Sequence, residues 1–175
     1  MLSSLPFNKK LLNLPKNPQW IVFCDFDETY YSHGMTEEQR EDVKRLEAFV
    51  AEKSEAGQLL LGWVTGSSLD SVTSKMEKGG FHQFPHFIAS NLGTEIVYTS
   101  DAHFGQPDAE WMKRLDAQGF SDEKIDDILE TIREKGISLR PQTQLGSSGY
   151  KKNFYYQEQD ERTDLYHLSF IQNTG

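Results

Sequence analysis

The sequence predicts an α/β fold built on a parallel, doubly wound (Rossmann-like) sheet, followed by part of a second, α+β lobe. Short apolar segments alternate with helical segments along the first 100 residues, which is the pattern of a sheet wound by right-handed crossovers. Two of these apolar segments end in polar motifs. The alternation then stops, so we expect residues 1–100 to form the N-terminal part of a core and residues 101–175 a partial second domain.

The first predicted strand is Ile21 to Cys24, a continuous, β-branched-rich apolar run that is typical of a strand covered on both faces. A helix follows, because Thr36 and Gln39 have the spacing of a capping box and Gly57 supplies a stop. Its predicted apolar stripe consists of Val43, Leu46, Phe49 and Val50.

The second predicted strand ends at Thr65-Gly66, and residues 68–80 predict a short helix. Residues 87–90 and 94–98 predict two further strands. In the second lobe, residues 121–136 predict an amphipathic helix. Its inward-facing side chains are predicted to be Ile125, Ile128, Leu129 and Ile132. The strand candidates that follow this helix are residues 137–144 and 151–159.

The composition favours a soluble protein that acts on a small molecule. The formal charge is -9, with 27 acidic against 18 basic side chains, which argues against an electrostatic nucleic-acid binder. No apolar run approaches the roughly 18 residues that a membrane span needs. The single cysteine, Cys24, lies inside an apolar run and predicts a reduced core thiol, hence a cytoplasmic location.

Two aspartates, Asp25 and Asp27, lie at the end of the first strand, where parallel sheets bind ligands. Unpaired, they would repel each other. A Mg²⁺ ion would remove the conflict, since it is held by one or two carboxylates and keeps waters for substrate phosphate. Alternatively, the pair shares a proton, so that one carboxyl is an acid beside an ionised neighbour. Both arrangements suit covalent phosphoryl transfer, with Thr29 securing the loop. The remaining interpretation is that residues 25–27 form a plain polar turn and that Thr65 is a helix cap.

A transferred phosphoryl group needs hydrogen-bond donors around its oxygens. The candidates are the backbone N–H groups that follow Asp25, beginning with Phe26, and the hydroxyl of Thr65. The N–H groups of Gly66 and Ser67, at the start of a predicted helix, are further candidates. We therefore expect the two strand ends to form one phosphate-binding site.

These residues resemble two motifs of the haloacid dehalogenase superfamily. "DFDET", residues 25–29, is similar to its DxDxT motif, and "LLLGWVTG" is similar to its second motif, an apolar strand that ends in Thr or Ser. Further along, "FPHFIASNLGTEIVY" resembles a segment of the sucrose-phosphate phosphatases in which a hairpin follows the third strand. "YKKNFYYQ" is similar to a cap-domain strand of the same enzymes, so the resemblance covers residues 20–161.

The resemblance implies a haloacid dehalogenase core with an α+β cap and a Mg²⁺-dependent phosphatase activity. Asp25 would be the nucleophile that forms an aspartyl-phosphate, and Asp27 the acid that protonates the leaving sugar oxygen and then activates water. Asp25 and Asp27, the latter through its backbone carbonyl, would hold Mg²⁺, and Thr65 would bind the phosphoryl oxygens. The implied substrate is a hexose 6-phosphate, such as an amino-sugar phosphate.

In the cap, Lys151, Lys152 and Tyr155 are candidates for sugar contacts, with a solvated lysine pair and a packed aromatic ring as the alternative. Superfamily members also carry a lysine and an acidic pair after the cap, and neither Asp126-Asp127 nor Asp160-Glu161 has the required setting. We therefore expect a C-terminally truncated phosphatase with impaired activity. A catalytically inactive phosphosugar-binding or interaction fragment is one alternative, and a phosphomutase is another.

Overall fold

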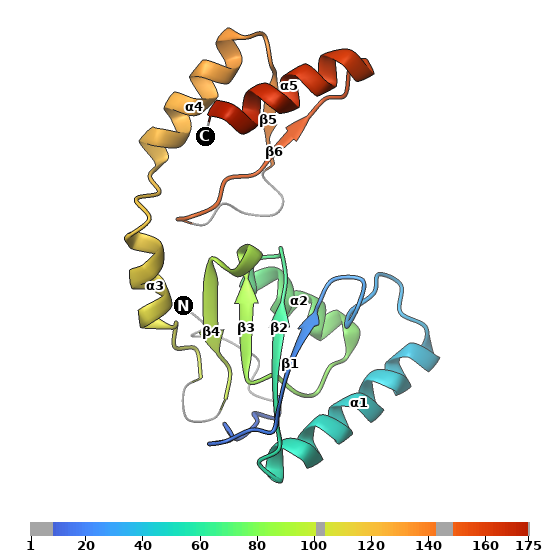
Figure 1. Ribbon diagram of the computed structural model, residues 1–175. Helices are drawn as coiled ribbons and strands as arrows, with labels where there is room; N and C mark the ends of the chain where they lie inside the picture. Colours follow the sequence, from blue (N-terminus) through green and yellow to red (C-terminus); the bar gives the residue numbers. More distant parts are fainter. Residues whose placement is uncertain (1–8, 101–103, 143–148, 175) are drawn as a thin grey trace. The chain divides into compact units, whose positions relative to one another are not determined.

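The chain divides into two compact units, Met1–Lys113 and Arg114–Gly175 (Figure 1). A computed structural model describes residues 9–100, 104–142 and 149–174. The domain boundary expected after residue 100 stays a prediction, and the two compact units divide between Lys113 and Arg114.

Unit 1 is built on a four-stranded sheet in the order β1-β2-β3-β4 (Figure 1). The strands are β1 (Trp20–Asp25), β2 (Leu59–Val64), β3 (Phe87–Ser90) and β4 (Glu95–Tyr98). The first three are parallel, and β4 returns antiparallel to β3 through a 3-10 turn. This sheet confirms the predicted α/β class and all four predicted strands.

Helices α1 (Glu37–Glu55) and α2 (Leu69–Gly79) connect the parallel strands. The predicted capping box is present, because the Gln39 N–H donates to the Thr36 hydroxyl at 3.2 Å and the Thr36 N–H donates to the Gln39 side chain at 2.8 Å. Helix α2 ends at Gly80, whose φ of 72° lies in the left-handed region that glycine adopts without strain.

Alternate residues of β2 point into one hydrophobic core. Leu61 and Trp63 are both buried there. Val50 of α1 and Val72 and Met76 of α2 belong to the same buried cluster. Since side chains two apart in a strand share a face, both helices cover the same face of the sheet.

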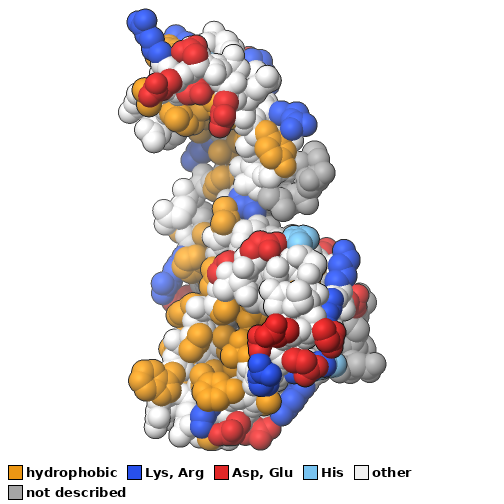
Figure 2. All heavy atoms as spheres, turned by 90° about the vertical axis from the view of Figure 1, so that its right-hand side faces the viewer, with side chains coloured by type: hydrophobic (Ala, Val, Ile, Leu, Met, Phe, Trp, Pro, Cys, Tyr) orange, Lys and Arg blue, Asp and Glu red, His pale blue; other side chains and the backbone are white. Residues whose placement is uncertain are grey.

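The opposite face of the sheet carries exposed apolar side chains. Ile21 and Phe23 of β1 are 57% and 66% exposed. The expectation that this strand is covered on both faces is therefore wrong for the part of the chain that the structure describes. The reason is that β1 forms an edge of the sheet. Trp20 and Val22, which pair with Leu59 and Leu61 on the helix-covered face, are also 66% and 40% exposed. Figure 2, seen from the right-hand side of Figure 1, shows hydrophobic side chains gathered beside a charged surface.

The predicted apolar stripe of α1 is partly wrong. Val50 is buried as predicted, but Leu46 and Phe49 are 43% and 50% exposed. The buried face of the helix includes Glu47 instead, whose carboxylate accepts two main-chain N–H groups of the loop after α2 at 3.0 and 3.1 Å. A buried polar side chain with hydrogen-bond partners thus takes a place that the pattern assigned to apolar ones.

The described residues of unit 2 include helices α4 (Asp122–Glu134) and α5 (Glu161–Thr174) and an antiparallel pair of strands, β5 (Leu139–Pro141) and β6 (Phe154–Tyr156). The predicted amphipathic helix is confirmed as α4, and its four inward-facing side chains are partly or fully buried. Both predicted strands are present in shorter form, and residues 143 and 144 of the first lie outside the described residues.

Two helices were not predicted, namely α3 (Ala109–Asp116) and α5. Helix α5 begins after Asp160, whose carboxylate accepts the N–H groups of Arg162 and Thr163 at 3.1 Å each. Asp160 is therefore a helix cap, as its side-chain chemistry favours. None of the helices in the described ranges is long and apolar enough to cross a membrane.

Candidate active site

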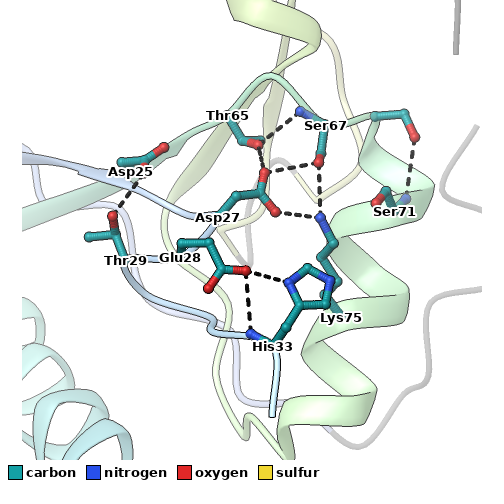
Figure 3. Close-up of polar contacts among 10 residues, drawn as sticks. Asp25, Asp27, Glu28, Thr29, His33, Thr65, Ser67, Ser71 and Lys75 are labelled. Atoms are coloured by element: carbon teal, nitrogen blue, oxygen red, sulfur yellow. Dashed lines mark hydrogen bonds and ion pairs between the residues drawn. The ribbon is translucent and has the colours of Figure 1, made fainter. Parts of the chain in front are cut away.

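The carboxyl ends of β1 and β2 bring the two predicted motifs together (Figure 3). β1 ends at Asp25, which lies opposite Val64 of β2, and Thr65 follows directly. The Thr65 hydroxyl donates to Oδ2 of Asp27 at 2.5 Å. Parallel pairing of the two strands, rather than proximity in the sequence, therefore builds the site.

Phe26 fixes the bend between the two aspartates. Its side chain is fully buried, with its ring centre 4.8 Å from that of Trp63. Its N–H, which was predicted to face a phosphate, instead donates to the carbonyl of Val64 at 3.2 Å. In this structure Phe26 is thus a core anchor for the site, and a contact between Phe26 and substrate stays a prediction.

The loop after Asp27 turns back on itself at Glu28, whose φ of 57° lies in the left-handed region. The Glu28 carboxylate pairs with His33, and this hydrogen bond lowers the pKa of Glu28. Thr29 donates its hydroxyl to Oδ2 of Asp25 at 2.8 Å, as predicted for a residue that secures the loop. The loop thereby holds the Asp25 carboxylate at the surface.

Asp27 is held by three donors. The hydroxyls of Thr65 and Ser67 donate to its Oδ2 at 2.5 and 2.9 Å, and the Lys75 ammonium forms an ion pair with its Oδ1 (Figure 3). Burial alone would raise the pKa of Asp27, but hydrogen bonds from Lys75, Thr65 and Ser67 outweigh it and hold this pKa below its ordinary value. Asp27 is therefore ionised near neutral pH in this arrangement.

The two carboxylates point toward different partners (Figure 3). Asp25 faces the Thr29 hydroxyl, while Asp27 faces Lys75 and the turn after β2. Their mutual repulsion is thus reduced without a shared proton, since no hydrogen bond joins the two aspartates among the contacts of these described residues. The shared-proton alternative is absent from this conformation.

Lys75 is the member of this cluster that the sequence analysis missed. It lies on α2 about two helical turns after the N-cap Ser68, which places it on the side of the helix nearest the turn. Its Nζ is 3.1 Å from the hydroxyl oxygen of Ser67. The spacing from the helix start could have identified it, because side chains two turns apart share a face.

The model of the sucrose-6F-phosphate phosphohydrolase family matches residues 18–169. The chain belongs to this family. Kanosamine-6-phosphate phosphatase of Bacillus subtilis (strain 168) is 50% identical over 173 residues, which are 98% of this chain and 61% of that protein. This chain therefore spans about three fifths of the length of this relative.

Two solved structures confirm the haloacid dehalogenase-like fold of this phosphohydrolase-family chain. A haloacid dehalogenase-like hydrolase from Bacillus subtilis matches with a TM-score of 0.74 at 50% identity, covering 96% of this chain and 59% of that one. The sucrose-phosphatase from Synechocystis sp. PCC6803, in complex with sucrose and phosphate, matches with a TM-score of 0.63 at 19% identity, covering 91% and 58%. The second likeness shows the fold alone.

The other predicted phosphate donors are in the turn after β2, residues 65–67. This turn lies beside Asp27. Thr65 and Ser67 are buried, and the Ser67 N–H donates to the Thr65 hydroxyl oxygen at 2.9 Å. A Cβ at Gly66 would lie 3.3 Å from a side-chain carbon of Leu92, which is 69% exposed. The roles of Thr65, Gly66 and Ser67 toward phosphate stay predictions.

The lysines predicted to contact the sugar lie in unit 2. Lys151 is buried, which lowers its pKa. Lys152 forms ion pairs with Asp122 and Asp126 of α4 at 3.1 and 3.6 Å. Lys152 is thus engaged within its own unit, and the sugar contacts of both lysines stay predictions.

Asp25 and Asp27 remain the candidates for holding a metal. In the parts of the chain that are described, no group of three or more His, Cys, Asp or Glu side chains could hold a metal ion. The oxygen donors present nevertheless fit Mg²⁺, which uses one or two carboxylates and completes its shell with water and phosphate. With the Asp27 carboxylate turned toward Lys75, the fitting donors are the Asp25 carboxylate and the backbone carbonyl of Asp27.

Proposed function

We propose that this chain carries the nucleophile, the acid and the phosphate-binding turn of a Mg²⁺-dependent sugar-phosphate phosphatase. One observation carries the proposal. At the carboxyl ends of β1 and β2, the exposed Asp25 carboxylate lies beside a corner in which hydroxyl and ammonium donors converge on an anionic group. A nucleophile next to fixed donors is the arrangement that phosphoryl transfer requires.

The proposed substrate is a hexose 6-phosphate. Family membership supports a sugar phosphate, and the relative at 50% identity bears the name kanosamine-6-phosphate phosphatase. Kanosamine 6-phosphate is therefore the candidate substrate, and sucrose 6F-phosphate, a disaccharide phosphate that the family is named after, is the comparison. A cytoplasmic location is proposed with it, because the free thiol of Cys24 packs partly buried against the core and burial raises its pKa.

In the proposed reaction, a carboxylate oxygen of Asp25 attacks phosphorus, and the bond between phosphorus and the sugar oxygen breaks. Asp27 is ionised in this arrangement, so it first takes up a proton from solvent and then gives this proton to the departing oxygen. It then accepts a proton from the water that attacks the aspartyl-phosphate, which restores Asp25 and releases phosphate. Asp25 and the Asp27 carbonyl would hold Mg²⁺, whose charge offsets the negative charges of phosphate and nucleophile when it is bound.

Phosphate release with Mg²⁺ from kanosamine 6-phosphate, glucose 6-phosphate and sucrose 6F-phosphate tests the proposal. Asp25→Asn should lower kcat at least roughly 10³-fold, because the nucleophile is lost. Asp127→Asn is the matched control, since Asp127 is exposed on α4. Turnover that survives Asp25→Asn would contradict the assigned mechanism.

A second candidate function is phosphosugar binding without turnover. One observation favours it: in the described ranges, no group of three or more His, Cys, Asp or Glu side chains could hold a metal ion. Calorimetry with the same sugar phosphates separates the two functions. Binding without phosphate release would support the second candidate, and turnover by the 175-residue chain would refute it.

A further inference from the structure

The ion pair between Lys75 and Asp27 indicates a role for Lys75 that neither recognised motif contains. We propose that Lys75 binds the phosphoryl group of the substrate together with Thr65 and Ser67, and that Asp27 occupies these donors until the phosphoryl group displaces it. The proposal rests on the proposed function and assigns to the same site a positively charged side chain, the Lys75 ammonium group.

Lys75 differs from the other lysine of α2 in its surroundings. The Lys75 side chain is 16% exposed, whereas Lys78 lies exposed in the last turn of the helix. An ammonium group that loses water needs acceptors in compensation, or its burial costs free energy. Val72, three residues before Lys75, and Met76, the residue after it, are buried in the core and hold this part of α2 against the sheet. The helix therefore fixes the Lys75 ammonium near the strand ends.

The three donors surround one anionic group. Thr65 and Ser67 each bring a hydroxyl to one oxygen of the Asp27 carboxylate, and Lys75 brings its ammonium to the other oxygen (Figure 3). The Lys75 Nζ also donates to the Ser67 hydroxyl oxygen at 3.1 Å, so the donors are linked to one another. A phosphoryl group presents three non-bridging oxygens with more negative charge, and charge-assisted hydrogen bonds to such oxygens are the strong ones.

Asp27 cannot keep this position during the proposed reaction. Both of its carboxylate oxygens are engaged, yet the reaction requires one of them at the leaving sugar oxygen. A phosphoryl group that takes the hydroxyl of Thr65 and the ammonium of Lys75 would release Asp27. In this exchange the partly buried ammonium always has an anionic partner, so neither state contains an unpaired cation.

Titration of inorganic phosphate into the 175-residue chain by calorimetry, with Mg²⁺ at one fixed concentration throughout, tests the exchange. Lys75→Met should weaken phosphate binding by about 10- to 100-fold, the range expected for a lost charge-assisted contact. Asp27→Asn should strengthen binding by about 10-fold, because the competing anion is removed. Lys78→Met is the matched control and should change the Kd by less than about twofold.

A double variant separates this role from a merely structural one. Lys75→Met alone leaves Asp27 without its cation and can lower stability, whereas Lys75→Met with Asp27→Asn leaves no unpaired charge. We expect the double variant to bind phosphate at least about 10-fold more weakly than Asp27→Asn. Equal binding by these two variants would mean that Lys75 only holds Asp27, and would overturn the proposal.

Three other results would also overturn it: phosphate binding by Lys75→Met that matches Lys78→Met, weaker binding by Asp27→Asn than by the unaltered chain, or no phosphate binding at millimolar concentration. The readout does not require turnover. If binding responds as expected and no sugar phosphate is hydrolysed, the proposed function fails and the role of Lys75 stands. If hydrolysis depends on Asp25 but phosphate binding is unchanged in Lys75→Met, the proposed function stands and the role of Lys75 fails.

Discussion

The two faces of the four-stranded sheet differ in what covers them. On one face, Phe26, Trp63 and Ile88 are fully buried beneath α1 and α2. On the other face, Ile21 and Phe23 of the edge strand are mostly exposed. The candidate site belongs to the first environment, because Phe26 lies between its two aspartates and is anchored in the covered core. The covered face therefore determines the geometry of the site, and the exposed face is a liability for association.

The largest effect on stability is expected from Phe26→Ala on the covered face. Its ring contacts the rings of Tyr30 and Trp63, among others, so its loss should lower the free energy of unfolding by about 3–5 kcal/mol. Phe23→Ala, on the exposed face, should cost about 1 kcal/mol or less. Urea unfolding of both variants checks the contrast, and equal losses would mean that the two faces are equally packed.

A smaller effect should come from pH, through His86 on the covered side. Its Nδ1 accepts the N–H of Leu61 at 2.9 Å and its Nε2 pairs with the Ser54 hydroxyl at 2.8 Å, so the buried ring is neutral. Burial lowers its pKa below the ordinary 6.5. Protonation therefore favours the unfolded chain, and stability is complete above 6.5 and decreases as the pH falls below it.

The expected decrease is at most about 1.4 kcal/mol per pH unit until the pH reaches the folded-state pKa. Urea unfolding near pH 7.5 and near pH 5.5 measures it. His86→Asn keeps an acceptor for the Leu61 N–H but does not titrate, so its stability should change less between the two conditions. An unchanged pH dependence in His86→Asn would assign the effect to other groups.

The smallest effect on stability is expected from Phe23→Lys on the exposed face, within about 0.5 kcal/mol of the unaltered chain. Its effect on association should be clear, because a charge interrupts the apolar surface at the sheet edge. Sedimentation velocity at rising protein concentration should show less self-association than in the unaltered chain. Phe49→Lys, which changes a half-exposed side chain of α1 away from the sheet edge, is the control for the added charge. A strictly monomeric unaltered chain would contradict the view that this face is a liability.

Most of the fold could be predicted because local signals and tertiary packing agree. The capping box of Thr36 and Gln39, the apolar run that ends just before Thr65 and the periodicity of α4 all specify their elements within a short window. Coverage could not be predicted in the same way. An apolar run such as Ile21 to Cys24 predicts a strand. How exposed that strand is depends on which other elements lie beside it.

The site could be predicted only in part. Asp25, Asp27 and Thr65 belong to motifs with recognisable spacing, and the structure brings these residues together. Lys75 belongs to neither motif. Its spacing of about two turns from the helix start indicates its face of α2, but its partner depends on how α2 packs against the strand ends. For Phe26, residue type alone could not separate a core anchor from a residue that faces the substrate.

The central claim is that Asp25 accepts the phosphoryl group. Its most direct test is to incubate the chain with Mg²⁺ and kanosamine 6-phosphate, quench with acid, and locate the phosphoryl group by peptide mass spectrometry. We predict an acid-stable, hydroxylamine-sensitive phosphoryl group on Asp25, within the peptide that contains residues 21–30, and none in Asp25→Asn. Phosphate release without a phosphoryl group on Asp25, or with one on another residue, would contradict the claim.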